Sequence, residues 1–556
     1  ELTILKNYIS FRSQNITFLS CSIIYVIRKD ENFNNKKTVI NIEIGTYKVV
    51  EEFFQVHCFS SPSNSWKKHF MVLVPKIKEN TIANELNVIL LGADSVSHME
   101  FLRSLPKSYI YLTKVMKSVT LNGYNIVGDG TPQAFLPILT GQTEVELPLT
   151  RKRYKEANFV DVYPFIWNTF SKKGYITGFG EDMPEIDMFT YRLKGFKERP
   201  TDHYLRPFML ELLNHLGDKS RDCNGEIPTV EEWFKYIEGF LKNYRNQPVF
   251  GLFHHALFTH DAERGQLLDE YLYDFLKRNY EANMFENTIV FTMADHGARF
   301  TKQRETSQGQ IEERMPFFSV YLPPKLRSHP AFKNLKVNAD RLTTPFDIYS
   351  TFLDILDFDN IPEADFTVAP TRPLKRSLSL FRPILDDRTC KEAHIEPHWC
   401  TCVEWRSIME DNNLRSLREE LVLNTIKVFN GFLEEEKDLC AELKLLKINK
   451  VERLAPDEGV LNYNGIKDQD GFVPKFEEAK ILKDFVTYRL FFQTEPGLAK
   501  YEVTVKFNEE TKELKIDRQA ISHTNKYGNL PHCVIDRNYF LGNFCVCKDI
   551  IGLKSG

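Results

Sequence analysis

Four apolar runs between residues 86 and 293 each lead into acidic or imidazole side chains, and this repetition constrains the fold more than any other feature. The runs are Leu86–Leu91, Tyr175–Gly178, Pro248–Phe253 and Thr288–Met293. Their β-branched and aromatic residues predict buried strands. Between the last two runs, residues 267–276 carry apolar side chains at the spacing of one helical stripe. Strands joined by helices predict an α/β fold, a mostly parallel sheet with helices on both faces.

Ligands of such sheets bind beyond the carboxyl ends of the strands, so the residues after the four runs should gather at one edge. These residues are Asp94, Glu181, Asp182, His254, His255, His260, Asp261, Asp295 and His296. Asp295 and His296 alone are equally compatible with an ordinary surface turn. Together with Asp94 they offer two carboxylate oxygens and one nitrogen, a ligand set suited to Zn²⁺.

Thr131 is the candidate nucleophile. It lies in the glycine-flanked stretch Gly128–Pro132, before a segment that is able to start a helix. A hydroxyl bound to a metal has a lowered pKa and becomes able to attack phosphorus or sulfur. The alternative is structural, because Thr131 also fits a helix N-cap with Pro132 at the first helical position.

The length of 556 residues predicts more than one domain. We expect a small N-terminal β-domain at 1–82 and an α/β catalytic domain at 83–385. A cysteine-containing helical connector is expected at 386–480, followed by a C-terminal β-region at 481–556. Closely spaced apolar runs support the first of these domains, and the alternation from Tyr501 to Phe507 supports the last.

Ten cysteines and a net charge of −4 limit the cellular setting. The charge gives no support to nucleic-acid binding, which needs a clustered basic face. Cys400/Cys402 and Cys545/Cys547 could be zinc ligands, but disulfides are favoured, including one between Cys21 and Cys58 in the N-terminal domain. We therefore expect an extracellular or secretory-pathway protein, with a sequon at Asn15 as a glycosylation candidate.

No apolar run approaches the length of about 20 residues that a membrane helix needs. The chain begins at Glu1 rather than Met, which is compatible with removal of a signal peptide or of a membrane tether.

Several motifs resemble the alkaline phosphatase superfamily, and most closely its branch called domain of unknown function 229. They are GADSVS at 92–97, GDGTPQAFLPILTG at 128–141, GYITGFGED at 174–182, TDHYLRPF at 201–208, THD at 259–261, ADHGARF at 294–300, QGQIEERMPF at 308–317 and IEPHWCTC at 395–402. Their order and placement at strand ends carry the resemblance. It implies an alkaline-phosphatase-like α/β fold in a secreted or membrane-tethered protein.

The resemblance also implies roles for individual residues. The superfamily nucleophile corresponds to Thr131, and Asp94, Asp295 and His296 complete one metal site. A second metal is usually held by an Asp and a His in a DxxxH-like element and by a later His. Here His260 matches, but Ala256 occupies the Asp position.

After His296 the next histidine is His329, beyond the usual place of the late ligand. Glu312, Glu313, Asp261 and His255 remain possible substitutes in the second site. The turn around Thr131 also lacks the two Asn residues of its relatives, and such an amide is able to donate to a developing oxyanion.

These observations predict a metal-dependent phosphoryl hydrolase or transferase, with Zn²⁺ as the favoured metal. Its partner would be a phosphate ester of unspecified class, such as a lipid headgroup, a glycan or a nucleotide. One alternative is a catalytically degenerate binding or scaffold protein that keeps the fold and one metal. A sulfatase is the other, although no C/S-x-P-x-R motif is present to supply a formylglycine.

Four neighbouring residues have open assignments. His203 and Arg206 either face the site or form structural contacts, since an Arg fork can clamp a phosphate or a carboxylate. Of His254 and His255, we expect one to be buried and the other to face the site, because successive strand residues point in opposite directions.

Overall fold

The computed structural model divides the chain into two compact units, residues 1–298 with 307–394, and residues 299–306 with 395–556. The residues described are 2–5, 8–11, 20–42, 45–61, 64–78, 86–152, 154–216, 221–260, 263–455, 462–468, 471–477, 485–526, 528–535 and 538–551. The sequon at Asn15 and the candidate ligand Asp261 lie outside them. The domain boundaries predicted after residues 82, 385 and 480 stay predictions.

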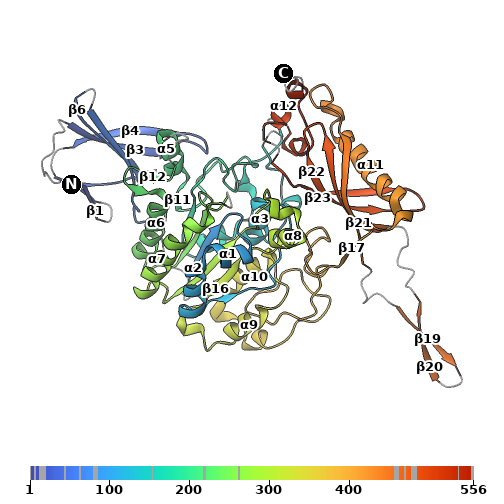
Figure 1. The fold of residues 1–556 in the computed structure, drawn as a ribbon. Coiled ribbons are helices and arrows are strands. Elements are labelled where there is room, and N and C mark those ends of the chain that lie inside the picture. The colour runs from blue at the N-terminus through green and yellow to red at the C-terminus, as the bar shows by residue number, and fades with distance from the viewer. Residues whose placement is uncertain are drawn as a thin grey trace. The chain divides into compact units, whose positions relative to one another are not determined.

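The first unit contains a seven-stranded sheet in the order β11-β10-β14-β8-β15-β16-β9 (Figure 1). The four predicted strands are its central members. The strands are β8 (Asn87–Ala93), β9 (Val119–Thr120), β10 (Ile176–Glu181), β11 (His203–Tyr204), β14 (Val249–His255), β15 (Thr288–Ala294) and β16 (Phe318–Tyr321). The strands from β11 to β15 pair in parallel, whereas β16 and β9 add antiparallel pairs at one edge. The predicted α/β class is therefore confirmed.

Alternate residues of β8 enter two different apolar clusters. Val88 and Leu90 pack in one cluster, and Ile89 and Leu91 pack in the other. Because successive strand residues point to opposite faces, the two clusters cover the two faces of the sheet. Helices α3 (Thr131–Thr140), α4 (Ile166–Lys172) and α10 (Pro345–Leu356) contribute to the first cluster, and α6 (Thr229–Asn243) and α7 (Leu268–Glu281) contribute to the second.

Two smaller antiparallel sheets precede the main sheet, in the orders β1-β2-β5 and β4-β3-β6-β7. Their strands are β1 (Leu2–Leu5), β2 (Tyr8–Phe11), β3 (Ser20–Arg28), β4 (Asn34–Ile42), β5 (Gly45–Lys48), β6 (Phe53–Ser61) and β7 (Asn64–Met71). Cys21 of β3 lies opposite Cys58 of β6 and is bonded to it. This confirms the disulfide predicted across two strands.

The second unit is built on a five-stranded antiparallel sheet with the order β17-β18-β21-β22-β23. Helix α11 (Arg415–Phe432) packs against this sheet (Figure 1). The strands are β17 (Trp405–Ser407), β18 (Lys444–Leu454), β21 (Val486–Glu495), β22 (Lys500–Phe507) and β23 (Leu514–His523), with a separate hairpin of β19 (Asn462–Asp468) and β20 (Gly471–Glu477). The expected connector at 386–480 thus contains a helix, but four strands accompany it.

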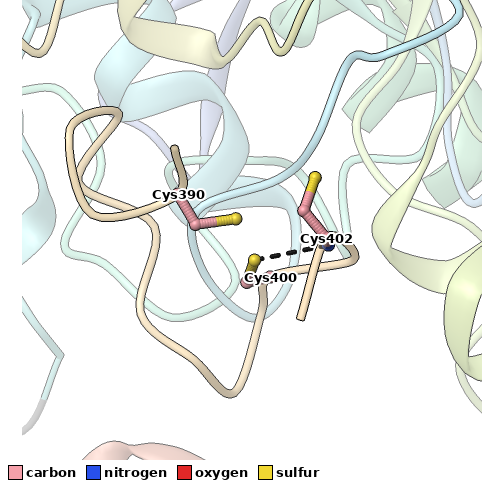
Figure 2. Close-up of side chains that lie close together, drawn as sticks. All are labelled: Cys390, Cys400 and Cys402. Carbon is pink, nitrogen blue, oxygen red and sulfur yellow. Dashed lines mark hydrogen bonds between the residues drawn. The ribbon is translucent and has the colours of Figure 1, made fainter. Parts of the chain in front are cut away.

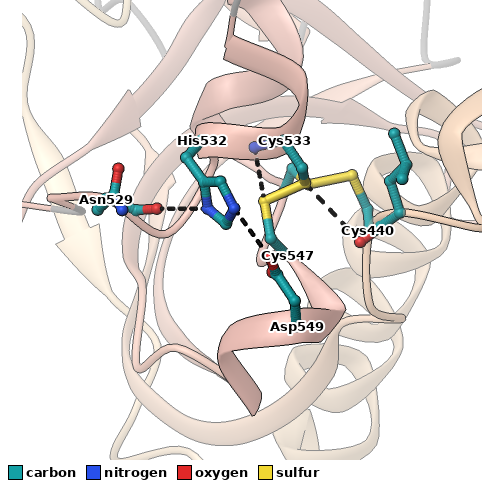
Figure 3. The surroundings of a disulfide bond; sticks show 8 residues. Cys440, Asn529, His532, Cys533, Cys547 and Asp549 are labelled. Atoms are coloured by element: carbon teal, nitrogen blue, oxygen red, sulfur yellow. Dashed lines mark hydrogen bonds and ion pairs between the residues drawn. A yellow bond between two sulfur atoms is a disulfide. The ribbon is translucent and has the colours of Figure 1, made fainter. Parts of the chain in front are cut away.

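Disulfides close the end of this unit. Cys440 is bonded to Cys545. Cys533 is bonded to Cys547 (Figure 3). The disulfide interpretation of these cysteines is confirmed, and it fits an oxidising compartment. Within the described part of the chain, no helix combines the length and the apolar character needed to cross a membrane.

Residues 299–306 follow the Asp295–Gly297 turn directly but belong to the second unit. Arg304 is fully buried there, and its Nη2 lies 2.6 Å from Glu502 Oε2 on β22. The chain therefore leaves the first unit just after the predicted ligand pair and re-enters it at Ser307.

The buried pair of Arg388 and Asp347 fixes the start of α10 in the first unit. Both side chains are fully shielded from solvent and lie 2.8 Å apart. Asp347 also accepts from the backbone N–H groups of Thr344 and Leu378. Helix α10 packs on α3, which begins at the candidate nucleophile Thr131. The buried pair therefore stabilises the helix against which α3 packs.

We expect Arg388→Met to lower the free energy of unfolding by about 3–5 kcal/mol, because it leaves a buried carboxylate without its cation. Arg372→Met is the matched control. Its pairs with Asp387 and Glu392 are exposed at the Arg side, and exposed pairs contribute at most about 1 kcal/mol. Urea denaturation measures both variants, and equal losses would contradict the assignment.

Candidate active site

The ends of β14, β8 and β15 meet at one edge of the main sheet. Ala93 pairs with His255 on one side and with Ala294 on the other. The Asp94 N–H donates to His255 O at 2.8 Å. Asp94, the residue after Ala93, therefore lies between the two neighbouring strand ends, beside Asp295 and His296.

Asp94, Asp295 and His296 form one compact ligand group. All three side chains are buried, and one ligand atom of each lies within 4.8 Å of the others. His296 Nε2 is 3.2 Å from Asp295 Oδ2 and 3.9 Å from Asp94 Oδ1. Two carboxylates and an imidazole have thus been brought together, as the sequence predicts.

The hydrogen bonds of this group engage its outer atoms, so that the atoms facing one another could bind a cation. Asp295 Oδ1 accepts from the Ser95 and His296 N–H groups, at 3.0 and 2.9 Å. His296 Nδ1 lies 2.9 Å from the carbonyl oxygen of Gly297, which can only accept, so Nδ1 carries the proton. Asp295 Oδ2 and His296 Nε2 are buried with no hydrogen-bond partner among the described residues. A lone pair on Nε2 facing two carboxylates fits a divalent metal.

Three other clusters of potential metal ligands contain disulfide-bonded cysteines, whose sulfur atoms are not thiolates. Figure 2 shows Cys390, Cys400 and Cys402. Cys390 and Cys400 are disulfide-bonded, whereas Cys402 is a free cysteine, so the disulfide prediction is wrong for Cys402. Figure 3 shows cysteines of the other two clusters, with His532 2.9 Å from Asp549. Of the four clusters found in the described residues, Asp94, Asp295 and His296 alone retain every ligand.

Thr131 is the first residue of α3, and Gly130 is its N-cap. Gly130 has φ of 94°, a conformation that disfavours other residues. The capping role considered for Thr131 is therefore wrong. Thr131 instead lines a small pocket together with Asp94, His254 and Ala256, so the candidate nucleophile and the ligand group share one cavity.

His260 was predicted as a ligand, and the structure places it in contact with Asp94. Its Nδ1 lies 2.8 Å from Asp94 Oδ2, and 41% of its side chain is exposed. Burial raises the pKa of the Asp94 carboxyl, but the His260 hydrogen bond and the nearby His296 outweigh it and hold the pKa well below its usual range. Asp94 is therefore kept as a carboxylate, the form that binds metals.

Two of the residues considered for a second metal site, His255 and Glu312, are engaged elsewhere. His255 Nδ1 lies 2.5 Å from Asp182 Oδ2, and Asp182 Oδ1 accepts from the Ala256 N–H at 2.8 Å. Glu312 accepts from Ser97 and is paired with Arg103.

The open assignments of four neighbouring side chains now have answers. His203 contacts Glu52 and Tyr244, and Arg206 contacts Asp187, so both are structural. His254 and His255 are both buried. His254 lines the Thr131 pocket, whereas His255 packs against Trp233 and Phe258 on the other side.

Ser95 is a site residue that the sequence analysis does not identify. Besides its N–H bond to Asp295, its hydroxyl donates to Asp94 Oδ1 at 2.8 Å. Its backbone has φ of 63°, unusual for a residue with a Cβ. Its position directly after Asp94, at the end of a strand, is the signal that could have pointed to it.

We expect the protein to bind roughly one divalent metal, as a three-residue ligand set with an open position does. Even outer partners of metal ligands contribute about 10- to 100-fold in affinity, so His296→Ala should lower the affinity by more than this. His532→Ala, in the disulfide cluster, should change nothing. Elemental analysis after dialysis measures both variants, and equal metal contents would refute the site.

Gly297 permits the close approach that orients the ligand pair. Its N–H donates to Glu313 O at 2.9 Å, and a Cβ added here would lie 2.3 Å from Glu312 O. We expect Gly297→Ala to destabilise the protein by about 1–3 kcal/mol and to weaken metal binding. Gly431→Ala is the control, because a Cβ added there meets no atom within 4 Å and should stabilise α11 by about 0.5–1 kcal/mol. Calorimetry with and without metal tests this contrast, and unchanged stability and metal affinity in Gly297→Ala would contradict it.

Three solved structures have some likeness to the chain, and each of them is distant from it. A lipoteichoic acid synthase LtaP from Listeria monocytogenes is 13% identical, with a TM-score of 0.35 over 50% of this chain and 75% of its own. A protein in the alkaline phosphatase superfamily from Vibrio parahaemolyticus is 12% identical, with a TM-score of 0.37 over 85% and 91%. The Zn complex of the periplasmic EcEptC domain from Escherichia coli is 13% identical, with a TM-score of 0.34 over 51% and 86%. None of these likenesses transfers an activity to this chain.

No curated protein matches the chain. A family match, in contrast, covers most of it, from residue 3 to residue 449. The branch indicated by the sequence motifs is thereby confirmed: the chain belongs to the family described as "Protein of unknown function (DUF229)".

Proposed function

We propose that the protein is a metal-dependent phosphoryl-transfer enzyme, a phosphate-ester hydrolase or phosphoryl transferase with Thr131 as its nucleophile. One observation carries this proposal. Thr131 and Asp94 line the same pocket, and Asp94 belongs to the buried ligand group with Asp295 and His296.

The ligand group would hold the metal through Asp94, Asp295 and His296, with the Thr131 oxygen at the open position. Zn²⁺ suits this mixture of carboxylate and imidazole ligands. When bound, such an ion supplies positive charge that lowers the pKa of a nearby hydroxyl and stabilises negative charge on a phosphoryl group.

The residues of the chain supply position and further charge. Thr131 opens α3, and the N-terminal end of a helix stabilises anions through its free N–H groups and its dipole. A phosphoryl group at Thr131 would lie at this end. Phe135 and His254, which are buried and in contact with each other, form an aromatic wall on the α3 side of the Thr131 pocket.

The reaction has two displacements at phosphorus. In the first, the Thr131 hydroxyl gives up its proton as Oγ bonds to phosphorus, the bond to the ester oxygen breaks, and the leaving oxygen takes up a proton to depart as the alcohol. In the second, the oxygen of water or of an acceptor alcohol bonds to phosphorus and loses its proton, the bond between phosphorus and Thr131 Oγ breaks, and Oγ regains a proton as phosphate or the new ester leaves. Covalent intermediates of this kind divide one difficult displacement into two easier ones.

A binding or scaffold protein is the second candidate, and Ala256 favours it. Ala256 lines the Thr131 pocket where relatives are expected to carry a carboxylate ligand. A sulfatase is disfavoured, since Thr131 cannot form the formylglycine of that class. For either candidate function, the disulfides support an extracellular or luminal location.

Thr131→Val tests the nucleophile, because it removes the hydroxyl and keeps the shape. We expect turnover of aryl phosphate monoesters and diesters to fall by at least about a thousandfold, since covalent catalysis would be lost, with the fold intact. Thr131→Ser should retain activity and form a phosphoserine detectable by mass spectrometry. Undiminished turnover by Thr131→Val would refute the assignment. Stoichiometric metal without turnover of any ester in the wild type would favour the binding protein.

A further inference from the structure

Beside Thr131 lies a group of acidic side chains that the proposed reaction does not use. Glu181, at the end of β10, and Asp187, in the loop after it, line the same pocket as Thr131, Asp94, His254 and Ala256. The space is about large enough for one group the size of a water molecule. We call the part bounded by Glu181, Asp187 and His254 the acidic pocket.

Buried polar atoms of the acidic pocket have no hydrogen-bond partner among the described residues. They are Asp187 Oδ1 and both ring nitrogens of His254. Asp187 is 4% exposed and His254 is 2% exposed. Such atoms cost free energy unless something completes their hydrogen bonds. The acidic pocket is therefore prepared to receive a polar group.

The charges around the acidic pocket call for a cation. Asp187 Oδ2 contacts Arg206, but Arg206 is also 3.5 Å from Glu31, so two carboxylates share it. Glu181 has one oxygen engaged by the Met188 N–H at 2.9 Å. Arg206 lies near Glu181 but makes its ion pairs with Asp187 and Glu31, so Glu181 has no ion pair of its own among the described residues. Burial and the neighbouring carboxylates raise the pKa of Asp187 to about 7 and that of Glu181 well above its usual range, so the charged forms of both groups are disfavoured while no further cation is near. A bound cation would stabilise both groups as carboxylates.

The spacing favours an ammonium over a second metal ion. No three ligand atoms of the acidic pocket lie within 4.8 Å of one another in the described chain, in contrast to Asp94, Asp295 and His296. An ammonium donates three hydrogen bonds of about 2.8–3.0 Å and can span more widely separated acceptors. Glu181, Asp187 and the lone pair of His254 provide three such acceptors.

We propose that the acidic pocket binds a primary ammonium carried by the substrate, so that the enzyme acts on phosphate esters of amino alcohols. This inference rests on the proposed function, because it places the ammonium on a group attached to the phosphorus that Thr131 attacks. Gly92 leaves room for the His254 ring, because a Cβ at residue 92 would lie 2.4 Å from His254 Nδ1. The amine remains unreacted, and only the phosphorus–oxygen bonds change.

Two matched substrates test the preference, 2-aminoethyl and 2-hydroxyethyl 4-nitrophenyl phosphate. Thr131 attack would release 4-nitrophenolate from both and leave the 2-substituted ethyl phosphoryl group on the hydroxyl. A hydrogen bond to a charged group contributes about 1.5–3 kcal/mol, so kcat/KM should favour the amine by about 10- to 100-fold. A ratio near one in the wild type would overturn the proposal.

The isosteric variants Glu181→Gln and Asp187→Asn should bring this ratio close to one through loss on the amine substrate. Glu181→Gln keeps a carbonyl oxygen for the Met188 N–H, so the loop should stay folded. Glu185→Gln is the matched control, because Glu185 lies in the same loop but pairs with Arg221 at the surface. An unchanged ratio in both pocket variants, or an equal fall in the control, would contradict the assignment.

A binding measurement separates this inference from the proposed function. In Thr131→Val, ethylammonium chloride should raise the melting temperature by about 2 °C or more over sodium chloride at equal ionic strength. Tetramethylammonium, which has no N–H, should not, and Glu181→Gln should abolish the shift. This measurement does not depend on turnover. A wild type without activity would refute the proposed reaction, but the shift in melting temperature would still test ammonium binding. The absence of any shift would refute the ammonium site.

A further pair of probes identifies the source of the amino alcohol. Soluble 2-aminoethyl phosphate esters and phosphatidylethanolamine vesicles carry the same headgroup chemistry. Turnover of the lipid alone would assign a membrane source, and turnover of the soluble esters alone would assign a soluble one. Turnover of phosphatidylcholine vesicles at an equal rate would contradict the ammonium pocket.

Discussion

The dominant constraint on this molecule is the cost of gathering carboxylates in a buried place. An isolated buried carboxylate costs several kcal/mol unless cations or N–H donors compensate it. Parallel strands β10, β14, β8 and β15 direct acidic and imidazole side chains to one edge, and several carboxylates there are compensated by donors or cations. Asp295 receives two backbone N–H groups, Asp182 contacts His255, and Asp187 shares Arg206. The carboxylates that are not fully compensated in this way mark the places where we propose that a metal ion and a substrate ammonium bind.

The main sheet and its ligand pair were predictable because their signals are local. Each predicted strand is a short apolar run, and the candidate ligands lie at or just after the end of their strand. Because the strands are parallel, these side chains meet at one edge of the sheet. β18 was missed because much of its surface is exposed and its sequence is rich in Lys, so period and composition do not mark it as a strand. Its place in the sheet depends on pairing with β17 and with β21, which is distant in sequence.

The parts of the site that could not be predicted depend on contacts between distant segments. The engagement of Glu312 by Arg103 and Ser97 joins residues more than 200 positions apart. The orphaned atoms of Asp187 and His254 are visible only once the loop after β10 is placed beside the end of β14. At Ala256, the motif comparison shows that an expected ligand is missing. It cannot show that Glu181 and Asp187 approach the same cavity from another strand and the loop after it.

The excursion of residues 299–306 into the second unit has a consequence for how this protein can be divided. Arg304 on that segment is neutralised by Glu502, which lies some 200 residues later in the chain. A protein truncated after His394 would retain every proposed ligand but would lose this carboxylate from a fully buried guanidinium. The first unit is therefore not expected to be a detachable module, since the segment that follows its proposed ligand pair places a buried guanidinium against the C-terminal sheet.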